Sequence, residues 1–420
     1  MTIMKTVTTP TETETRQTFE SQTSNTTSTV DKTENETETE NENENHDPTR
    51  ETGNRQLERH MTKTYRAALI GCSRMGAFID NEVAGNASVA LPYSHAAGYE
   101  ACPRTDLIAG SDVRQDVLDR FGERYGVAQA HRYIDYRALL STERPEIVSI
   151  ATQPEQRAEI ILDAVEAGVR ALYVEKPLCA SVNEAYRIRD AVRANSVALN
   201  MGTNRRWQPG FHAMRTAIDG GAIGKLRTIV VYATGTLFNT TSHWFDICQY
   251  LAGDATPVWA HAWLPGSEHL VVDDTVTDEP NASGAYGTLT GVTVHFLQSP
   301  RPNDIEAIGD NGAITAWGAG TSFTMRTRPA SGGAWTDAQF PYYANTSSTL
   351  HIIEDLVGAL DRGDDITAGG IDVAVTNTEL IFGFIESFRA NGSLLMMPPK
   401  GSTARFHRSG FKARTPTFAT

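Results

Sequence analysis

Short apolar runs alternate with amphipathic segments in the first half of the chain, starting at Tyr65. The first run, RAALIG at 66–71, is short, apolar and closed by a glycine, which is the pattern of a buried strand. Four further runs follow, and the segments between them carry apolar residues at helical spacing. Strands that alternate with helices of this length predict a parallel, doubly wound sheet. The further strands are expected at 106–111, 146–152, 170–177 and 196–202, and the helices at 114–126, 154–168 and 181–195.

The pattern changes after about residue 205. Longer strand-like segments follow, two of them with interior glycines, and helical patterns become few. This mixture favours an α+β architecture with a large, mostly antiparallel open sheet. The strands are expected at 225–235, 284–297 and 304–318, and the helices at 242–253, 349–363 and 373–392.

The first 61 residues differ in composition from the rest. They are rich in Thr, Glu and Asn and contain almost no aliphatic side chains. Such a segment cannot bury enough apolar surface to offset chain entropy, so we expect it to be disordered. It is either a solubilising or interacting tail or the product of a misassigned start, with translation beginning at Met61. The expected parts of the chain are an acidic tail at 1–61, a doubly wound domain at 62–203, an α+β domain at 204–396 and an irregular tail at 397–420.

Charge and composition exclude several classes of partner. The chain of 420 residues carries a formal net charge of −14, whereas nucleic acids and anionic membrane surfaces require basic patches. No apolar run reaches the roughly 20 residues of a membrane helix, and the N-terminus lacks the features of a secretory signal. We therefore expect a cytoplasmic protein. The 4 cysteines are scattered without disulfide or metal-ligand spacing, so no metal site is expected.

A glycine-containing turn follows the first strand. It reads GCSRMG, a G-x-S-x-x-G pattern with serine where dinucleotide-binding proteins usually carry their second glycine. A tight turn between a strand and a helix lets backbone N–H groups face a pyrophosphate, and the serine hydroxyl can donate to a phosphate as well. We expect NAD or NADP to be bound here through Gly71, Ser73, Arg74, Met75 and Gly76.

An acidic residue at the end of the second strand is expected to hold the adenosine ribose. Asp112 stands there, further from the glycines than usual because of an apparent inserted loop, although it could also be an ordinary turn residue. Arg114 could accept a 2′-phosphate, but Asp112 would repel that phosphate, so NAD is favoured over NADP. Thr152 and Gln153, at the end of the strand expected at 146–152, are expected beside the nicotinamide ribose.

Five short motifs occur along the chain: GCSRMG at 71–76, EKP at 175–177, NRRW at 204–207, GGAIGKLR at 220–227 and SHWFD at 242–246. In this order they resemble the GFO/IDH/MocA oxidoreductases, the family of glucose-fructose oxidoreductase and inositol dehydrogenase. The resemblance extends over residues 65 to about 395 and implies a Rossmann domain followed by a domain with an open sheet. It implies NAD(P)-dependent hydride transfer between a nicotinamide and a hydroxyl of a sugar, inositol or related polyol. It also implies a homodimer or homotetramer formed through the large sheet.

The resemblance assigns a catalytic role to the lysine of the EKP motif. It implies that Lys176 lies beside the nicotinamide and the substrate hydroxyl, that Glu175 belongs to the cofactor site, and that the bond to Pro177 is cis. A positioned base assists hydride transfer by removing the hydroxyl proton. Burial near a cationic ring would lower the pKa of the lysine.

The second catalytic element of the family is an Asp-x-x-x-His pair at a helix start, and here it reads Asn239 to His243. Residues four apart share a helix face. Asparagine can orient a hydroxyl but cannot take up a proton, which leaves Lys176 and His243 as the acid/base groups. Of the neighbouring Arg205 and Arg206, Arg205 is expected to contact the cofactor or the substrate, and an ordinary linker salt bridge is the alternative for an arginine at this place. Asp246 is interpreted as structural.

Two other functions stay open at this point. An NAD-dependent glycosidase on the same scaffold would use transient oxidation to enable elimination. A cofactor-binding regulator that has lost turnover would be compatible with asparagine at position 239. The presence of Lys176 and His243 favours the dehydrogenase.

Overall fold

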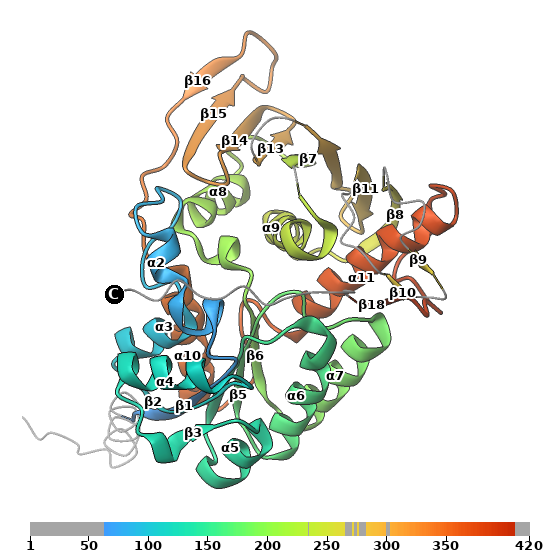
Figure 1. The fold of residues 1–420 in the computed structure, drawn as a ribbon. Coiled ribbons are helices and arrows are strands. Elements are labelled where there is room, and N and C mark those ends of the chain that lie inside the picture. The colour runs from blue at the N-terminus through green and yellow to red at the C-terminus, as the bar shows by residue number, and fades with distance from the viewer. Residues whose placement is uncertain are drawn as a thin grey trace, which may run out of the picture. The chain divides into compact units, whose positions relative to one another are not determined.

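A computed structural model describes residues 63–233, 235–264, 271–272, 275–276, 283–299 and 303–407. These residues build two large sheets with flanking helices (Figure 1). The acidic tail expected at 1–61 lies outside the described residues, as does the end of the chain from residue 408. The division into domains at residue 204 stays a prediction, and the described residues belong to one compact unit.

The first sheet is parallel throughout and has the strand order β3-β2-β1-β4-β5-β6. The strand order reverses between β1 and β4, as in a doubly wound sheet, which confirms the predicted fold class. The two-residue strand β3 is not predicted by the sequence, because so short a segment shows no periodicity. The strands are β1 (Tyr65–Ile70), β2 (Thr105–Ser111), β3 (Arg132–Tyr133), β4 (Ile147–Ile150), β5 (Ala171–Val174) and β6 (Ala198–Met201).

Helices cover both faces of this sheet. Apolar side chains of α5, α6 and α7 pack on one face, and those of α3 pack on the other. Local sequence sets the helix starts: the Ser181 hydroxyl accepts the N–H of Glu184 at the start of α7, and Pro154 opens α6. The helices are η1 (Arg74–Phe78), α2 (Asp80–Val83), α3 (His95–Ala101), α4 (Gln115–Tyr125), η2 (Gln129–His131), α5 (Tyr136–Glu143), α6 (Pro154–Glu166) and α7 (Val182–Ala194).

A helix from far along the chain completes the core on the α3 side. In α10 (Ser348–Arg362), Ile352 and Ile353 are fully buried in one cluster with Tyr65 and Ala67 of β1. The serine before this helix, Ser347, caps it by accepting the Leu350 N–H. Residues of the second half of the sequence therefore stabilise the first sheet directly.

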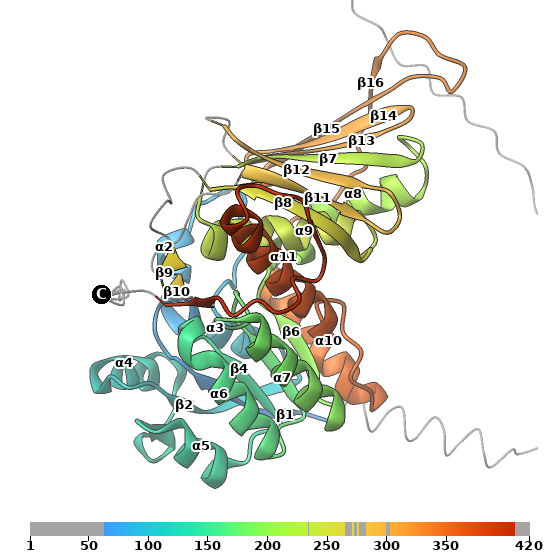
Figure 2. The ribbon, with the colours of Figure 1, turned by 90° about the vertical axis from the view of Figure 1, so that its right-hand side faces the viewer.

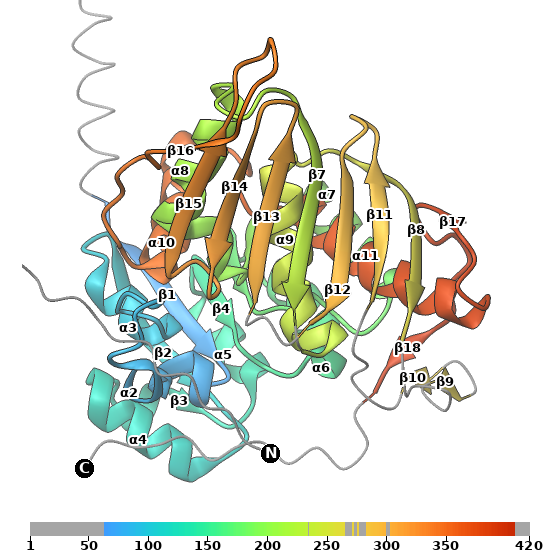
Figure 3. The ribbon, with the colours of Figure 1, turned by 90° about the horizontal axis from the view of Figure 1, so that it is seen from above.

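The second sheet has the order β16-β15-β14-β13-β7-β12-β11-β8-β17. Only the β7–β12 pairing within it is parallel, so the expectation of a mostly antiparallel open sheet is confirmed. Figure 3 shows this sheet with α8, α9 and α11 behind it. Its elements are β7 (Leu226–Ala233), β8 (Pro257–Trp263), β11 (Ser283–Thr288), β12 (Thr293–Gln298), β13 (Asp304–Gly309), β14 (Gly312–Trp317), β15 (Ser322–Thr327), β16 (Thr336–Ala338), β17 (Leu395–Met396), α8 (Pro209–Asp219), α9 (Ser242–Leu251) and α11 (Ile371–Arg389).

Two of the expected long strands are hairpins. The segments expected at 284–297 and 304–318 each fold into two antiparallel strands, β11–β12 and β13–β14. Gly291, with a φ of +84°, lies in the first turn, which explains one of the interior glycines. A small third sheet joins β18 (Arg405–Phe406) of the tail expected to be irregular to β10 (Thr275–Val276) and β9 (Val271–Val272).

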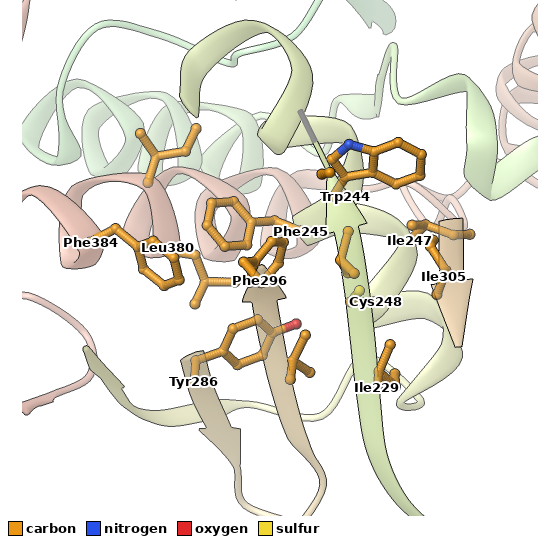
Figure 4. Packing of buried hydrophobic residues seen from close by; sticks show 14 of the residues in the cluster. Ile229, Trp244, Phe245, Ile247, Cys248, Tyr286, Phe296, Ile305, Leu380 and Phe384 are labelled. Atoms are coloured by element: carbon orange, nitrogen blue, oxygen red, sulfur yellow. The ribbon is translucent and has the colours of Figure 1, made fainter. Parts of the chain in front are cut away.

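Aromatic rings form the core between the second sheet and its helices (Figure 4). Phe245 of α9 packs edge-on against Phe296 of β12 and Phe384 of α11, with centroid distances of 4.8 and 5.0 Å. All three rings are buried. In Figure 2, α9 and α11 lie between the two sheets, and α11 contacts both β8 and β6. The position of α9 is thus fixed by packing on two sides.

Replacing Phe245 with alanine should lower the free energy of unfolding by about 3–5 kcal/mol, because it leaves a cavity among rings that cannot all move inward. Urea denaturation followed by circular dichroism measures the loss. Leu289→Ala is the control, since this side chain is 75% exposed, and it should change stability by less than about 0.5 kcal/mol. Equal losses in the two variants would contradict the packing described here.

Candidate active site

The carboxyl ends of β1, β4, β5 and β6 lie at one edge of the first sheet, because these strands are parallel. Ligands of open α/β sheets bind at this edge, where the strand order reverses. The reversal falls between β1 and β4. Most predicted site residues follow these strand ends: Gly71, Ser73, Arg74, Met75, Gly76, Thr152, Gln153, Glu175, Lys176 and Arg205.

The loop after β1 makes the tight turn that its glycines predict. Gly71 has a φ of +93°, and its N–H donates to the carbonyl oxygen of Ser111 at 2.7 Å. A Cβ at Gly71 would lie 2.9 Å from the carbonyl of Ala151, and a Cβ at Gly76 would lie 1.9 Å from the carbonyl oxygen of Gly71. Both positions therefore require glycine. Met75, between them, is partly buried.

The helical segment after this turn is short. The π-helical turn η1 and the four-residue helix α2 are followed by the insertion that the sequence indicates. The buried carboxylate of Asp80 accepts the backbone N–H of Tyr93 at 2.7 Å and that of Ser94 at 3.2 Å. This carboxylate fastens α2, at the beginning of the insertion, to the start of α3.

Ser73, Asp112 and Arg114 come together beside the glycine turn. The Nη2 of Arg114 donates to Ser73 Oγ at 2.7 Å, and its backbone N–H donates to Asp112 Oδ1 at 3.1 Å. Burial raises the pKa of Asp112, and this effect outweighs the hydrogen bond and the charge of Arg114. Arg74 instead forms an ion pair with Glu82 of α2, at 2.6 Å.

Arg157, whose role the sequence leaves unexplained, ties two loops at this edge. Its guanidinium donates to the carbonyl oxygens of Thr152 and Pro177. The peptide bond between Lys176 and Pro177 is cis, as the resemblance implies. Gln153 is the N-cap residue of α6 in the same loop as Thr152. Arg157 thereby holds the loop after β4 against the turn that carries Lys176.

Lys176 and Asn239 are in direct contact. The chain after β7 forms the π-helical turn η4 (Leu237–Thr241), which runs into α9. Lys176 Nζ donates to Asn239 Oδ1 at 2.6 Å and to its carbonyl oxygen at 3.2 Å. A lysine presented by the first sheet therefore meets an amide that follows a strand of the second sheet.

His243, in the first turn of α9, belongs to the same cluster. Its Nδ1 is buried and has no hydrogen-bond partner among the residues that the structure describes. Burial lowers the pKa of His243 well below its usual value, and the charges of Lys176 and Arg205 add to this effect. The imidazole is therefore neutral near pH 7 and can exchange hydrogen bonds with a bound hydroxyl.

The two neighbouring arginines of the NRRW motif have different surroundings. Arg206 pairs with Asp246 at 3.0 Å and with Asp254 at 2.7 Å, and it is the linker salt bridge that the sequence allowed for. This contact agrees with a structural role for Asp246. Arg205 lies over the ring of Trp244, 4.0 Å from its centroid. Burial lowers the pKa of Arg205 to about 10, so it stays a cation near the site.

Tyr93 lies near the site and is absent from the sequence-based prediction. Burial raises its pKa, and the charges of Arg205, Glu175 and Arg74 act on its phenol. Tyr93 belongs to the insertion, which has no periodicity, so only the position of the insertion next to the glycine turn could have indicated it. His95, two residues further on, is fully buried and lies 3.2 Å from Glu175.

Comparison with known proteins identifies a protein family for part of the chain. Residues 66–203 match the model of an oxidoreductase family with an NAD-binding Rossmann fold, GFO/IDH/MocA. Residues 66–203, the part of the chain with the parallel sheet, belong to the GFO/IDH/MocA oxidoreductase family. The match confirms the resemblance drawn from the motifs, and it confirms a nicotinamide dinucleotide as the class of cofactor.

Curated relatives of the chain include dehydrogenases of inositol. An inositol 2-dehydrogenase of Rhizobium meliloti is 25% identical over 334 residues, which cover 74% of this chain and 92% of that protein. The oxidoreductase YrbE of Bacillus subtilis is 27% identical over 217 residues, which cover 48% of this chain and 58% of that protein. The chain thus spans little more than half of the latter relative.

Solved structures show the same fold. An inositol dehydrogenase homologue from Azotobacter vinelandii, complexed with NADH and myo-inositol, has a TM-score of 0.64 and 17% identity and covers 80% of this chain and 98% of its own. Levoglucosan dehydrogenase in complex with NADH and levoglucosan has a TM-score of 0.63 and 17% identity, and the match covers 80% of this chain and 100% of that protein.

The described residues hold neither a membrane-spanning helix nor a metal-binding cluster. No helix among them is both long and apolar enough to cross a membrane. Within the same residues, no three side chains of His, Cys, Asp or Glu form a group that could hold a metal ion.

The turn after β1 fits a dinucleotide phosphate, since it is closed by two glycines that leave no room for a Cβ. Gly76→Ala should weaken NADH binding by about tenfold or more, because the new Cβ collides with the carbonyl of Gly71. NADH fluorescence titration measures the affinity. Gly126→Ala, at a helix end where nothing lies within 4 Å, is the control and should bind NADH normally. A folded Gly76→Ala variant with unchanged affinity would contradict this assignment.

Proposed function

We propose that this protein is an NAD(P)-dependent oxidoreductase that transfers hydride between a nicotinamide and a hydroxyl of a sugar, an inositol or a related polyol. The observation that carries the proposal is the 2.6 Å hydrogen bond from Lys176 Nζ to Asn239 Oδ1 at the carboxyl edge of the Rossmann sheet. Relatives described as inositol dehydrogenases support it. They give no support to the glycosidase or regulator alternatives.

The proposed cofactor site follows the strand ends. The bound nicotinamide supplies the carbon that takes or gives the hydride. NAD is favoured over NADP, because the Asp112 carboxylate would repel a 2′-phosphate and the Arg114 guanidinium already donates to Ser73. The residues proposed to hold the cofactor are Gly71, Ser73, Arg74, Met75, Gly76, Asp112, Arg114, Thr152, Gln153, Glu175, Lys176 and Arg205.

Lys176 is proposed to move the proton. Its amine takes up the substrate hydroxyl proton as the C–H bond breaks, and its ammonium returns that proton in the reverse direction. Asn239 orients the lysine and a substrate hydroxyl, since an amide accepts and donates hydrogen bonds without titrating. The neutral imidazole of His243 binds and polarises the reacting hydroxyl.

The remaining parts of the proposal concern partners and compartment. The substrate is a small polar molecule, which needs several hydrogen-bonding side chains for its orientation. Neither nucleic acid nor membrane is proposed as a partner, and the cytoplasm is kept as the proposed compartment on the sequence alone.

Lys176→Ala should lower kcat by about 100-fold or more while NADH affinity falls much less, because the base is lost and the other proposed cofactor contacts remain. The rate is followed at 340 nm with NAD and with NADP against a panel of inositols, aldoses and sugar acids. Lys225→Ala removes an exposed lysine of the GGAIGKLR motif and is the matched control.

Either of two results would count against the proposal. Turnover in Lys176→Ala equal to that of the wild type would remove the lysine from the mechanism. Tight cofactor binding without turnover across the whole panel would favour the regulator or the glycosidase.

We further propose a homodimer or homotetramer that forms through the outer face of the nine-stranded sheet. The helices α8, α9 and α11 lie behind the other face, as Figure 3 shows. The outer face presents apolar side chains from neighbouring strands, including Val230 of β7, Leu297 of β12 and Ile308 of β13. Leu297 is 46% exposed. Polar side chains such as His295 and Glu306 lie beside Val230 on this face, and such a mixture of apolar and polar side chains is common at protein–protein interfaces.

Leu297→Glu should shift the protein to a smaller species in analytical ultracentrifugation, because a charge would be buried at the interface. Leu289→Glu, in the turn between β11 and β12 and 75% exposed, is the matched control and should leave the mass unchanged. An unchanged mass of a folded Leu297→Glu variant would exclude this face as the interface.

A further inference from the structure

A histidine and a glutamate form a buried pair directly before Lys176. His95 Nε2 lies 3.2 Å from Glu175 Oε1, and the two side chains are 0% and 7% exposed. The other ring nitrogen lies 3.0 Å from the hydroxyl of Ser149 on β4. The imidazole also stacks on Tyr173 of β5, with 3.8 Å between the ring centroids. Contacts with Ser149, Tyr173 and Glu175 fix the position of the imidazole. The imidazole in turn restricts the position of the Glu175 carboxylate.

The surrounding chain leaves room for this carboxylate. A Cβ at Gly202, directly after β6, would lie 2.8 Å from Glu175 Oε1, so that position must stay free of a side chain. Lys176 follows Glu175 directly, and the next residue, Pro177, is held through its carbonyl oxygen by Arg157. The backbone of Lys176 is therefore anchored on both sides, which fixes where its amine can reach Asn239.

Glu175 is ionised in the folded protein. Burial alone would raise its pKa, but the hydrogen bond from His95 and the charges of His95, Lys176 and Arg157 lower the pKa below its ordinary value. The phenols of Tyr173 and Tyr93 face the same carboxylate, and its charge adds to burial in raising their pKa values. On the far side of Lys176, His243 is the titratable neighbour, and it is neutral. The attraction between Glu175 and Lys176 is mutual, so the carboxylate favours the ammonium form of the lysine.

We propose that His95 and Glu175 are positioning residues that act through Lys176: the histidine clamps the glutamate, and the glutamate fixes the lysine and places a negative charge beside it. The inference rests on the proposed function only for the part in which Lys176 moves a proton during turnover. The effect of Glu175 on the protonation of Lys176 does not require substrate, so it can be measured without turnover.

Trace acetylation of lysines with acetic anhydride over a range of pH, read by mass spectrometry on the full chain, reports the protonation of Lys176 without turnover. Glu175→Gln keeps the shape of the side chain and removes its charge. The midpoint of Lys176 labelling should then fall by about one pH unit, because the ammonium loses a neighbouring anion. If Glu175→Gln does not fold, the double variant His95→Gln/Glu175→Gln replaces the pair by two amides that can bond each other and carries the same expectation.

The chain offers a matched control in the same sheet. His131 and Glu143 form a second histidine–glutamate pair, with 2.7 Å between Nδ1 and Oε1. Glu143 ends α5, before β4 begins, and so lies at the edge opposite Lys176. Glu143→Gln should leave the Lys176 midpoint unchanged. A midpoint that is the same in Glu175→Gln and the wild type would overturn the proposal.

Steady-state kinetics test whether His95 acts through Lys176 during turnover. His95→Leu should lower kcat by about tenfold or more with KM near the wild-type value, and should displace the pH profile of kcat. His95→Gln, whose amide can still donate to Glu175, should restore most of the rate. A loss of rate without any displacement of the profile would reduce His95 to a purely structural residue. A shifted labelling midpoint in a protein that turns over no substrate would leave the effect on Lys176 intact and reject the proposed function alone.

Discussion

The buried guanidinium of Arg206 is the contact on which the arrangement of the site depends. Its Nε donates to Asp246 at 3.0 Å, its Nη2 to Asp254 at 2.7 Å, and its Nη1 to the carbonyl oxygen of Ala368 at 3.1 Å. These partners lie in α9, just beyond α9 and just before α11. A buried cation is tolerated when its donors find acceptors, and loss of one partner costs about 3–5 kcal/mol. The chain that leaves the first sheet is thereby fastened to the helices of the second.

The geometry around Lys176 follows from this fastening. Asn239 and His243 lie immediately before and at the start of α9, whereas Lys176 follows β5 of the other sheet. A hydrogen bond of 2.6 Å between Lys176 and Asn239 requires α9 to keep its position relative to β5. Packing of Phe245 on one side of α9 and the ion pairs of Arg206 on another supply that constraint. Catalytic geometry therefore depends on residues that do not touch the reacting groups.

The sequence predicts what depends on local periodicity and on strand ends. Alternating apolar runs give β1, β2 and β4 to β6 and the order of helices between them, and Asp112 is found because it follows such a run. Lys176, Asn239 and His243 owe their assignment to the resemblance of motifs, since spacing alone does not show that residues 63 positions apart are in contact.

The features that the sequence does not predict depend on contacts between distant segments of the chain. His95 meets a glutamate 80 positions away, and α10 packs on β1, which precedes it by about two thirds of the chain. Arg157 has no interpretable pattern, because its partners are two backbone carbonyls in separate loops. The hairpins of the second sheet are missed for a different reason: a turn of a few residues between two strands of similar composition hardly interrupts the apolar pattern.

The charges beside Lys176 explain how a site with asparagine at position 239 can still move a proton. An aspartate there would form an ion pair with the ammonium and hold its proton more tightly, whereas the amide accepts a hydrogen bond without adding charge. His243 adds no charge either, because burial keeps it neutral. The charge of Glu175 acts on the lysine, but the same carboxylate is shared with His95 and Arg157. The proton affinity of Lys176 is thus set by a carboxylate behind it rather than by the amide in front of it, so Asn239 and His243 face the lysine with neutral side chains.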